Sequence, residues 1–111
     1  GVLPYFTGKS GSLLEWLQDA HPKARLVKAF NSVGAGRMID PDFGGTRPTM
    51  FIAGNDADAK AIATTLLAQV GWDAADMGTA VAARAIEPLA MLWCIPGFRE
   101  GSWMHAFKLL R

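Results

Sequence analysis

The stretch TMFIAGNDADAKAIATTLLAQVGWDAADM, from Thr49 to Met77, decides the fold. Its first five residues form a short apolar run that is typical of a buried strand, and the following Gly-Asn-Asp supplies turn and helix-start chemistry. The run from Ala57 to Val70 favours a helix with one apolar face, and Gly71 is its natural end. The run from Trp72 to Met77 predicts a second strand. The whole stretch is therefore a strand, helix and strand unit.

Upstream segments continue this alternation. Gly1 to Ser12 is rich in Gly, Ser and Pro, which predicts a loop leading to a short helix capped by Ser10 or Ser12. The compact run RLVKAFN, from Arg25 to Asn31, predicts a strand because its residues are β-prone and a small-residue loop follows. An irregular connection with a short helix near residues 33–39 is expected between this run and Thr49.

Downstream, the residues from Ala80 to Ile95 predict a long apolar helix in which Pro88 should bend the helix or start a new one. The tail from Ser102 to Arg111 has helical spacing of its large apolar residues. Strands that alternate with helices favour a parallel sheet. The predicted fold is α/β: a partial Rossmann-like domain of about three parallel strands, covered by helices on both faces.

Length and composition predict one domain, residues 1–111, because the chain is long enough for a single core. The content is 50% hydrophobic and 19% charged, so some apolar surface should be covered by a partner. A net charge of +1, without basic clusters, gives no reason to expect nucleic acid or a membrane as a partner. There is no apolar run of roughly 18 residues and no secretory pattern, so we expect a cytoplasmic protein.

Few side chains suggest metal binding or covalent catalysis. The single cysteine, Cys94, lies in an apolar run and is expected to be a buried, inert thiol. His21 and His105 lie far apart, so no metal site is predicted. The glycines of Gly34-Ala35-Gly36 lack the third glycine of a dinucleotide turn, which favours a plain turn over a pyrophosphate site.

Several charged residues have two interpretations. Asp76 is expected at the carboxyl end of a parallel strand, where ligands of open α/β sheets bind, but Asp close to Gly is also ordinary turn chemistry. Asp56 and Asp58 suit the positive end of a helix. Arg84 and Glu87, three residues apart, should pair either at the surface or as a buried orienting pair.

Five ordered blocks together resemble the C-terminal half of the NADPH-dependent deazaflavin-coenzyme reductase family (NADP oxidoreductase, coenzyme F-420-dependent). The reductase domain of related membrane-anchored metalloreductases has the same pattern. The blocks, which span nearly the whole chain, are LVKAFNSVGA (26–35), FIAGNDADAK (51–60), DMG (76–78), ARAIEPLA (83–90) and FKLLR (107–111).

The resemblance implies NADP as cofactor and direct hydride transfer between two stacked planar rings, without a catalytic side chain. The loop after the KAFN-type strand should lie near the nicotinamide, which maps onto the cofactor-binding residues Asn31, Val33 and Ala35. The Asp-x-Gly stretch should face the acceptor, which maps onto the substrate-binding residues Asp76, Met77 and Gly78.

Family members first supply a Gly-x-Gly-x-x-Gly turn and several βα units, and these N-terminal units are missing here. The chain alone is therefore expected to bind NADP weakly or not at all. One hypothesis is a fragment of a reductase, which is favoured by a first residue that is glycine instead of methionine. The alternative is a stand-alone truncated half-domain that acts as a non-catalytic binding or oligomerisation module.

Both hypotheses predict a partner, either the missing N-terminal half or a second copy in a two-fold homodimer. A flavin-like small molecule is a further possible ligand. The expected contact surface consists of the sheet edge and apolar residues near the C-terminus: Met91, Leu92, Trp93, Ile95, Phe98, Trp103 and Phe107.

Overall fold

The computed structural model describes residues 11–111, so most of the expected N-terminal loop, and Ser10 as a helix cap, lie outside the described residues. In chain order the elements are α1 (Leu13–Ala20), the 3-10 helix η1 (Ala35–Arg37), β1 (Thr49–Ile52), α2 (Ala57–Gln69), β2 (Asp73–Asp76), the 3-10 helix η2 (Ala80–Ala82) and α3 (Ala83–Glu100).

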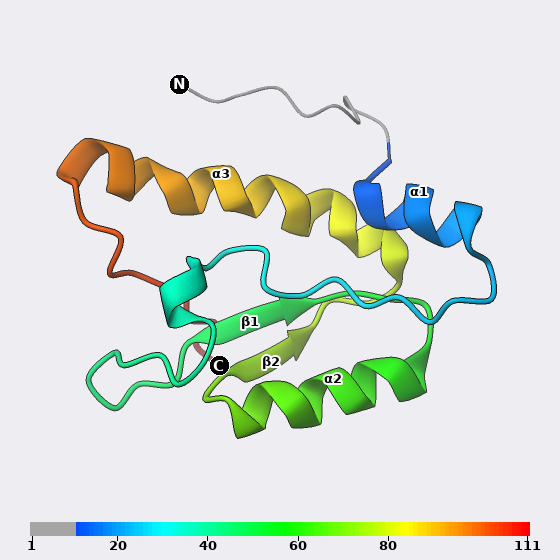
Figure 1. The fold of residues 1–111 in the computed structure, drawn as a ribbon, viewed down its shortest axis with the longest axis horizontal. Helices are drawn as coiled ribbons and strands as arrows, with labels where there is room; N and C mark the ends of the chain where they lie inside the picture. The colour runs from blue at the N-terminus through cyan, green and yellow to red at the C-terminus, as the bar shows by residue number, and fades with distance from the viewer. Residues whose placement is uncertain (1–10) are drawn as a thin grey trace.

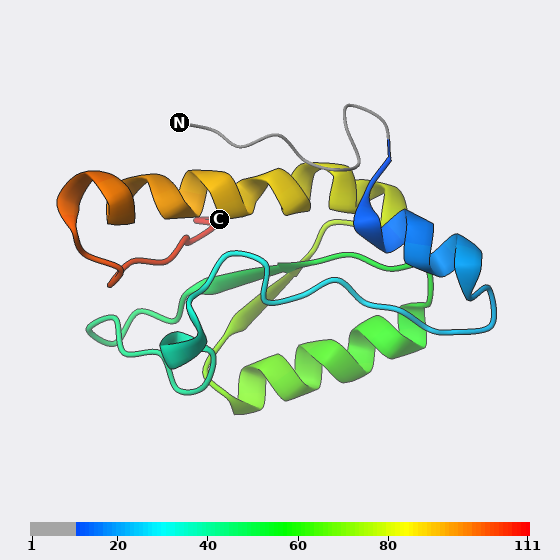
Figure 2. The same cartoon turned by 45° about the horizontal axis from the view of Figure 1, so that its top comes forward.

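These elements form three layers, with the two strands between α2 on one side and α1 and α3 on the other (Figures 1 and 2). β1 and β2 are parallel neighbours, in a register that runs from Thr49 opposite Asp73 to Ile52 opposite Asp76. Alternate residues of β1 point to opposite faces. One core cluster is therefore Met50, Ile52, Leu67 and Trp72, and the other is Leu14, Ala53, Ala80, Ala83 and Ile86. The prediction of a partial Rossmann-like α/β fold, with helices on both faces, is confirmed.

Local chemistry explains the strand, helix and strand unit. The Oδ1 atom of Asp56 accepts hydrogen bonds from the backbone N–H groups of Asp58 and Ala59, at 2.9 and 3.3 Å, and so caps α2. Gly71 follows the helix with a φ of +97°, which glycine adopts without strain. At Gly54 an added Cβ would lie 2.6 Å from the carbonyl oxygen of Leu26, so the chain packs closely here only because this residue has no side chain.

The segment from Arg25 to Asn31 is not a third parallel strand, and this prediction is wrong. Within the described chain it forms a single antiparallel bridge, in which Lys28 and Ala53 exchange backbone hydrogen bonds of 2.8 and 3.3 Å. Two residues after Lys28, Phe30 has a φ of +56°, and this left-handed conformation ends the extended backbone. β-propensity was therefore overridden by a local turn.

α3 extends further than predicted and runs through both Pro88 and Pro96 without interruption. Each proline removes the N–H that would bond to the carbonyl four residues earlier. Those carbonyls belong to Arg84 and Leu92, which are both exposed, so water can satisfy them. The helix ends at Gly101, which caps it with a φ of +71°.

Residues 80–100 form one helical segment that is long and apolar enough to cross a membrane by length and composition, with a mean hydropathy of 1.3. The sequence-based expectation that no such segment exists considered only uninterrupted apolar runs. Core helices of globular folds also satisfy these criteria when they are mostly buried, but only 22% of the apolar window is buried here. Here Ala83 and Ile86 on the inward face of α3 are packed against Ala53 of the sheet layer and Leu14 of α1.

The C-terminal tail is extended, so the predicted helix over residues 102–111 is wrong. The tail turns back beneath α3 (Figure 2), where the Trp103 ring packs 5.5 Å from that of Trp93. The indole N–H of Trp93 donates to the carbonyl of His105 at 3.0 Å, and the N–H of Thr49 donates to the carbonyl of Phe107 at 2.9 Å. These polar groups of the tail bond to α3 and β1 instead of within a helix.

Glu87 connects α3 to α1 through a buried carboxylate. Its two oxygens accept hydrogen bonds from the backbone N–H groups of Leu13 and Leu14, at 2.7 and 3.0 Å. The Nζ atom of Lys28 lies 3.7 Å from the same carboxylate. The first N–H groups of a helix have no partner within the helix, so an acidic side chain from another element is a favourable partner for them.

Arg84 does not form an ion pair with Glu87, because its guanidinium binds Glu15 of α1 instead. Its guanidinium donates to both carboxylate oxygens of Glu15, at 2.8 to 3.2 Å. These hydrogen bonds, and one from the Ser12 hydroxyl, lower the pKa of Glu15 against the opposing effect of burial; the same bonds raise the pKa of Arg84. The predicted Arg84–Glu87 pair is therefore wrong, and both residues hold α3 against α1.

Replacing Glu87 with glutamine tests this connection. The amide would present a donor to one of the two buried N–H groups, so we expect Glu87→Gln to lower the free energy of unfolding by roughly 1.5 to 3 kcal/mol. Urea denaturation measures the change. The matched control is Glu100→Gln at the exposed end of α3, for which we expect a change within about 0.5 kcal/mol. Equal effects of the two substitutions would contradict the role given to Glu87.

Candidate functional site

An open apolar groove of about 390 Å³ lies on the α3 side of the sheet, where β1 and β2 end. In α/β sheets, ligands bind outside the carboxyl ends of the parallel strands. The groove is lined by residues from β1, the loop after β2, η2 and the first turns of α3: Phe51, Met77, Ala82, Ala85, Ile86 and Leu89. It combines the expected position of a ligand site with a lining that suits an apolar ring.

The loop of Asp76, Met77 and Gly78 forms one wall of this groove through Met77. The N–H of Met77 donates to the carbonyl of Ile52 at 2.8 Å, which continues the pairing of the two strands. The Oδ1 atom of Asp76 accepts from the N–H of Gly78 at 2.9 Å, so the two residues close a tight turn around Met77. The three residues predicted to contact substrate therefore lie in one turn, of which Met77 lines the groove.

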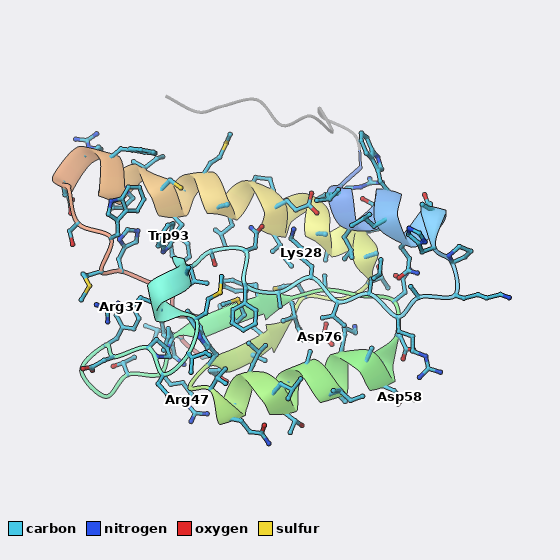
Figure 3. All side chains as sticks on the ribbon, in the orientation of Figure 1. Lys28, Arg37, Arg47, Asp58, Asp76 and Trp93 are labelled. Atoms are coloured by element: carbon cyan, nitrogen blue, oxygen red, sulfur yellow. The ribbon has the colours of Figure 1, made fainter. Side chains whose placement is uncertain are left out.

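Lys60 of α2 holds the same turn from the opposite side of the sheet. Its Nζ atom donates to Oδ1 of Asp76 and to the carbonyl of Gly78, each at 3.1 Å. Asp76 lies between β2 and α2 (Figure 3). The sequence-based prediction did not include Lys60, nor Phe51 and Leu89 in the groove. The sequence signal that could have pointed to Lys60 was a lysine early in a predicted helix.

The three residues predicted to lie near a nicotinamide are not arranged as one surface. The amide nitrogen of Asn31 donates to the backbone carbonyls of Ile86 and Glu87, so it fixes the segment to α3. Val33 packs against the core cluster on the α2 side, and Ala35 is exposed at the start of η1. Asn31 contacts a residue that lines the groove, because it bonds to the backbone carbonyl of Ile86.

Among the described residues, three helix ends are of the kind that binds a dinucleotide's pyrophosphate. Two of them are already bonded to carboxylates of the chain, and the third belongs to a helix that is too short. Glu87 takes the first N–H groups of α1, and Asp56 takes those of α2. Gly34 precedes only the single 3-10 turn η1, whose three residues offer no sustained helix dipole. A pyrophosphate therefore does not fit at these positions, whereas the apolar groove suits a flat ring.

A second, larger hollow of about 670 Å³ lies between the end of α1 and the start of α2. Its lining is polar, and Arg25 pairs there with Asp56 at 3.0 Å. Since Asp56 also caps α2, its carboxylate is already engaged. We therefore assign the candidate site to the apolar groove.

Comparison with known proteins supports a relation to reductases. No protein-family model matches the chain. The crystal structure of a "putative F420 dependent NADP-reductase" from Arthrobacter sp. FB24 matches 100% of the chain at 33% identity with a TM-score of 0.86, and the chain covers 55% of that protein. A hypothetical protein from Sinorhizobium meliloti, SMa0349, matches 75% of the chain at 29% identity with a TM-score of 0.56, and 44% of it is covered. The chain is thus similar to the Arthrobacter protein over its whole length and spans about half of that protein.

Proposed function

We propose that this chain is one part of an NADP-linked oxidoreductase in which hydride passes between the nicotinamide and a flavin-like acceptor. The observation that carries the proposal is the match of the whole chain to the Arthrobacter protein, at 33% identity over only 55% of that protein. The remaining part of such a reductase would supply the dinucleotide's phosphate site. In this arrangement the chain alone is inactive.

The groove supports this division of work. Phe51, Met77 and Leu89 give it apolar walls, and none of its six lining residues carries an ionisable group. Such a surface excludes water from one face of a planar ring and orients it, which is the contribution that a hydride transfer needs from a protein. We place the acceptor ring in the groove, with Met77 as the wall that the Asp76–Gly78 turn supplies.

The first experiment is a fluorescence titration of the purified 111-residue chain with NADPH. We expect no saturation up to about 1 mM, a concentration that corresponds to only about 4 kcal/mol of binding free energy. The physical reason is that Asp56 and Glu87 occupy the helix ends where a pyrophosphate would bind. Saturable binding at low micromolar NADPH would show that another loop, such as residues 44–47, forms an anion site.

A second candidate function is a stand-alone oligomerisation module, and the outer surface of α3 favours it. Leu92, Ile95 and Phe98 are exposed there, whereas Trp93 is buried against the tail and Phe107 is half-buried. The expected contact surface is therefore narrower than the sequence predicted. Apolar area yields roughly 25 cal/mol per Å² on burial, which favours association through this strip.

Light scattering at micromolar concentration measures the association. We expect twice the chain mass of 11.9 kDa, as for a two-fold homodimer, and a return toward the single-chain mass in Leu92→Glu. Met104→Glu, an exposed apolar site on the tail, is the matched control and should leave the mass unchanged. A wild-type chain that stays at 11.9 kDa would contradict the homodimer.

A further inference from the structure

We propose that Lys60 is a positioning residue, which holds the Asp76–Gly78 turn from behind the sheet so that Met77 closes the apolar groove on a flat aromatic ring. This inference rests on the proposed function for the identity of the ring. The positioning itself rests on geometry, because the 3.1 Å contacts of the Lys60 Nζ with Asp76 and Gly78 join α2 to the groove's rim.

The place of Lys60 in its helix is unfavourable on local grounds. It is the fourth residue of α2, near the positive end of the helix dipole, where Asp56 and Asp58 are the suitable charges. A lysine here gains nothing from the helix itself. Positions that break a local rule are expected where a contact elsewhere compensates, and here that contact is the turn.

Burial supports the same interpretation. The Lys60 side chain is only 13% exposed, although lysine is rarely buried without a partner, and Asp76 is 49% exposed. A pair with one exposed partner adds little to global stability. The main effect of Lys60 is therefore on where the turn lies, with little effect on whether the chain folds.

The bonding of the turn shows what depends on Lys60. Gly78, with a φ of +118°, also gives its carbonyl to the N–H of Gly54 at 3.1 Å, so its backbone has a second attachment. The Asp76 side chain has the Gly78 N–H and Lys60 as its two partners in these contacts. Without Lys60, Asp76 keeps only the Gly78 N–H as a partner among these contacts and can swing into water. Met77 is then held through its backbone bond to Ile52, and its side chain loses the support that the turn gives it beside Phe51.

The test uses the full 111-residue chain with ¹³C-labelled methionine methyl groups, and Met77→Leu assigns the Met77 signal. In the ligand-free protein we expect Lys60→Ala to shift and broaden this signal while leaving that of buried Met50 and the melting temperature nearly unchanged. Lys60→Arg should restore the wild-type signal. The matched control is Lys108→Ala, since Lys108 pairs at 2.9 Å with Asp73 at the other end of β2.

Riboflavin, a planar ring system without a phosphate, is the probe for the ring site. We expect a saturable shift of the Met77 signal in wild type, and an affinity roughly fivefold weaker in Lys60→Ala, as for loss of a preorganised wall. Lys60→Arg and Lys108→Ala should bind like wild type.

The outcomes separate the two proposals. A Lys60→Ala protein with the wild-type Met77 signal overturns the positioning role, whether or not riboflavin binds, and so does unchanged riboflavin affinity in this variant. If wild type does not respond to riboflavin, the ring-binding groove is overturned, while the ligand-free spectra still decide the role of Lys60 in placing Met77.

Discussion

The buried carboxylate of Glu87 ties together segments that lie far apart in the sequence. It accepts the first two N–H groups of α1 and lies next to Lys28, which forms the bridge to the end of β1. A charge that is buried in this way must be bonded on every side, because leaving it without partners costs several kcal/mol. These contacts therefore fix the position of α3 over the sheet at its first helical turns, which also line the groove.

This use of helix ends has a functional consequence. α1 and α2 each direct their first N–H groups at a carboxylate of the same chain, Glu87 and Asp56. At these two helix ends, the N–H groups that other α/β proteins use to bind phosphate are therefore bonded within the chain and hold the fold. The groove offers an apolar surface to a ligand, and the contrast between this groove and the occupied ends of α1 and α2 supports the proposal of a two-part reductase.

The sequence predicted those parts whose structure follows from local rules. The strand, helix and strand order from Thr49 to Met77 formed as expected because Asp56 caps the helix and β1 is a short apolar run. β2, with the sequence Asp-Ala-Ala-Asp, pairs with β1 in parallel. Residues 25–31 and 102–111 were mispredicted since their backbone partners lie elsewhere, as when Phe107 bonds to Thr49. A spacing pattern indicates the local preference for helix or strand, but it does not reveal backbone hydrogen-bond partners that lie far away in the sequence.

The candidate site was partly within reach of the sequence. Asp76, Met77 and Gly78 could be placed at a strand end from the order of the elements alone. Lys60 and Phe51 could not, because their relation to Met77 depends on how α2 and β1 pack around β2. The partners of Glu87 were equally hidden, since they lie 73 and 74 residues away.

The most direct test of a two-part reductase joins this chain to the part of the Arthrobacter protein that it does not match. NADPH absorbance would then be followed in the presence of a deazaflavin acceptor, with the Arthrobacter part alone and this chain alone as controls. We predict acceptor-dependent oxidation of NADPH by the joined protein and none by either part. A joined protein that folds and binds NADPH, yet transfers no hydride, would contradict the account.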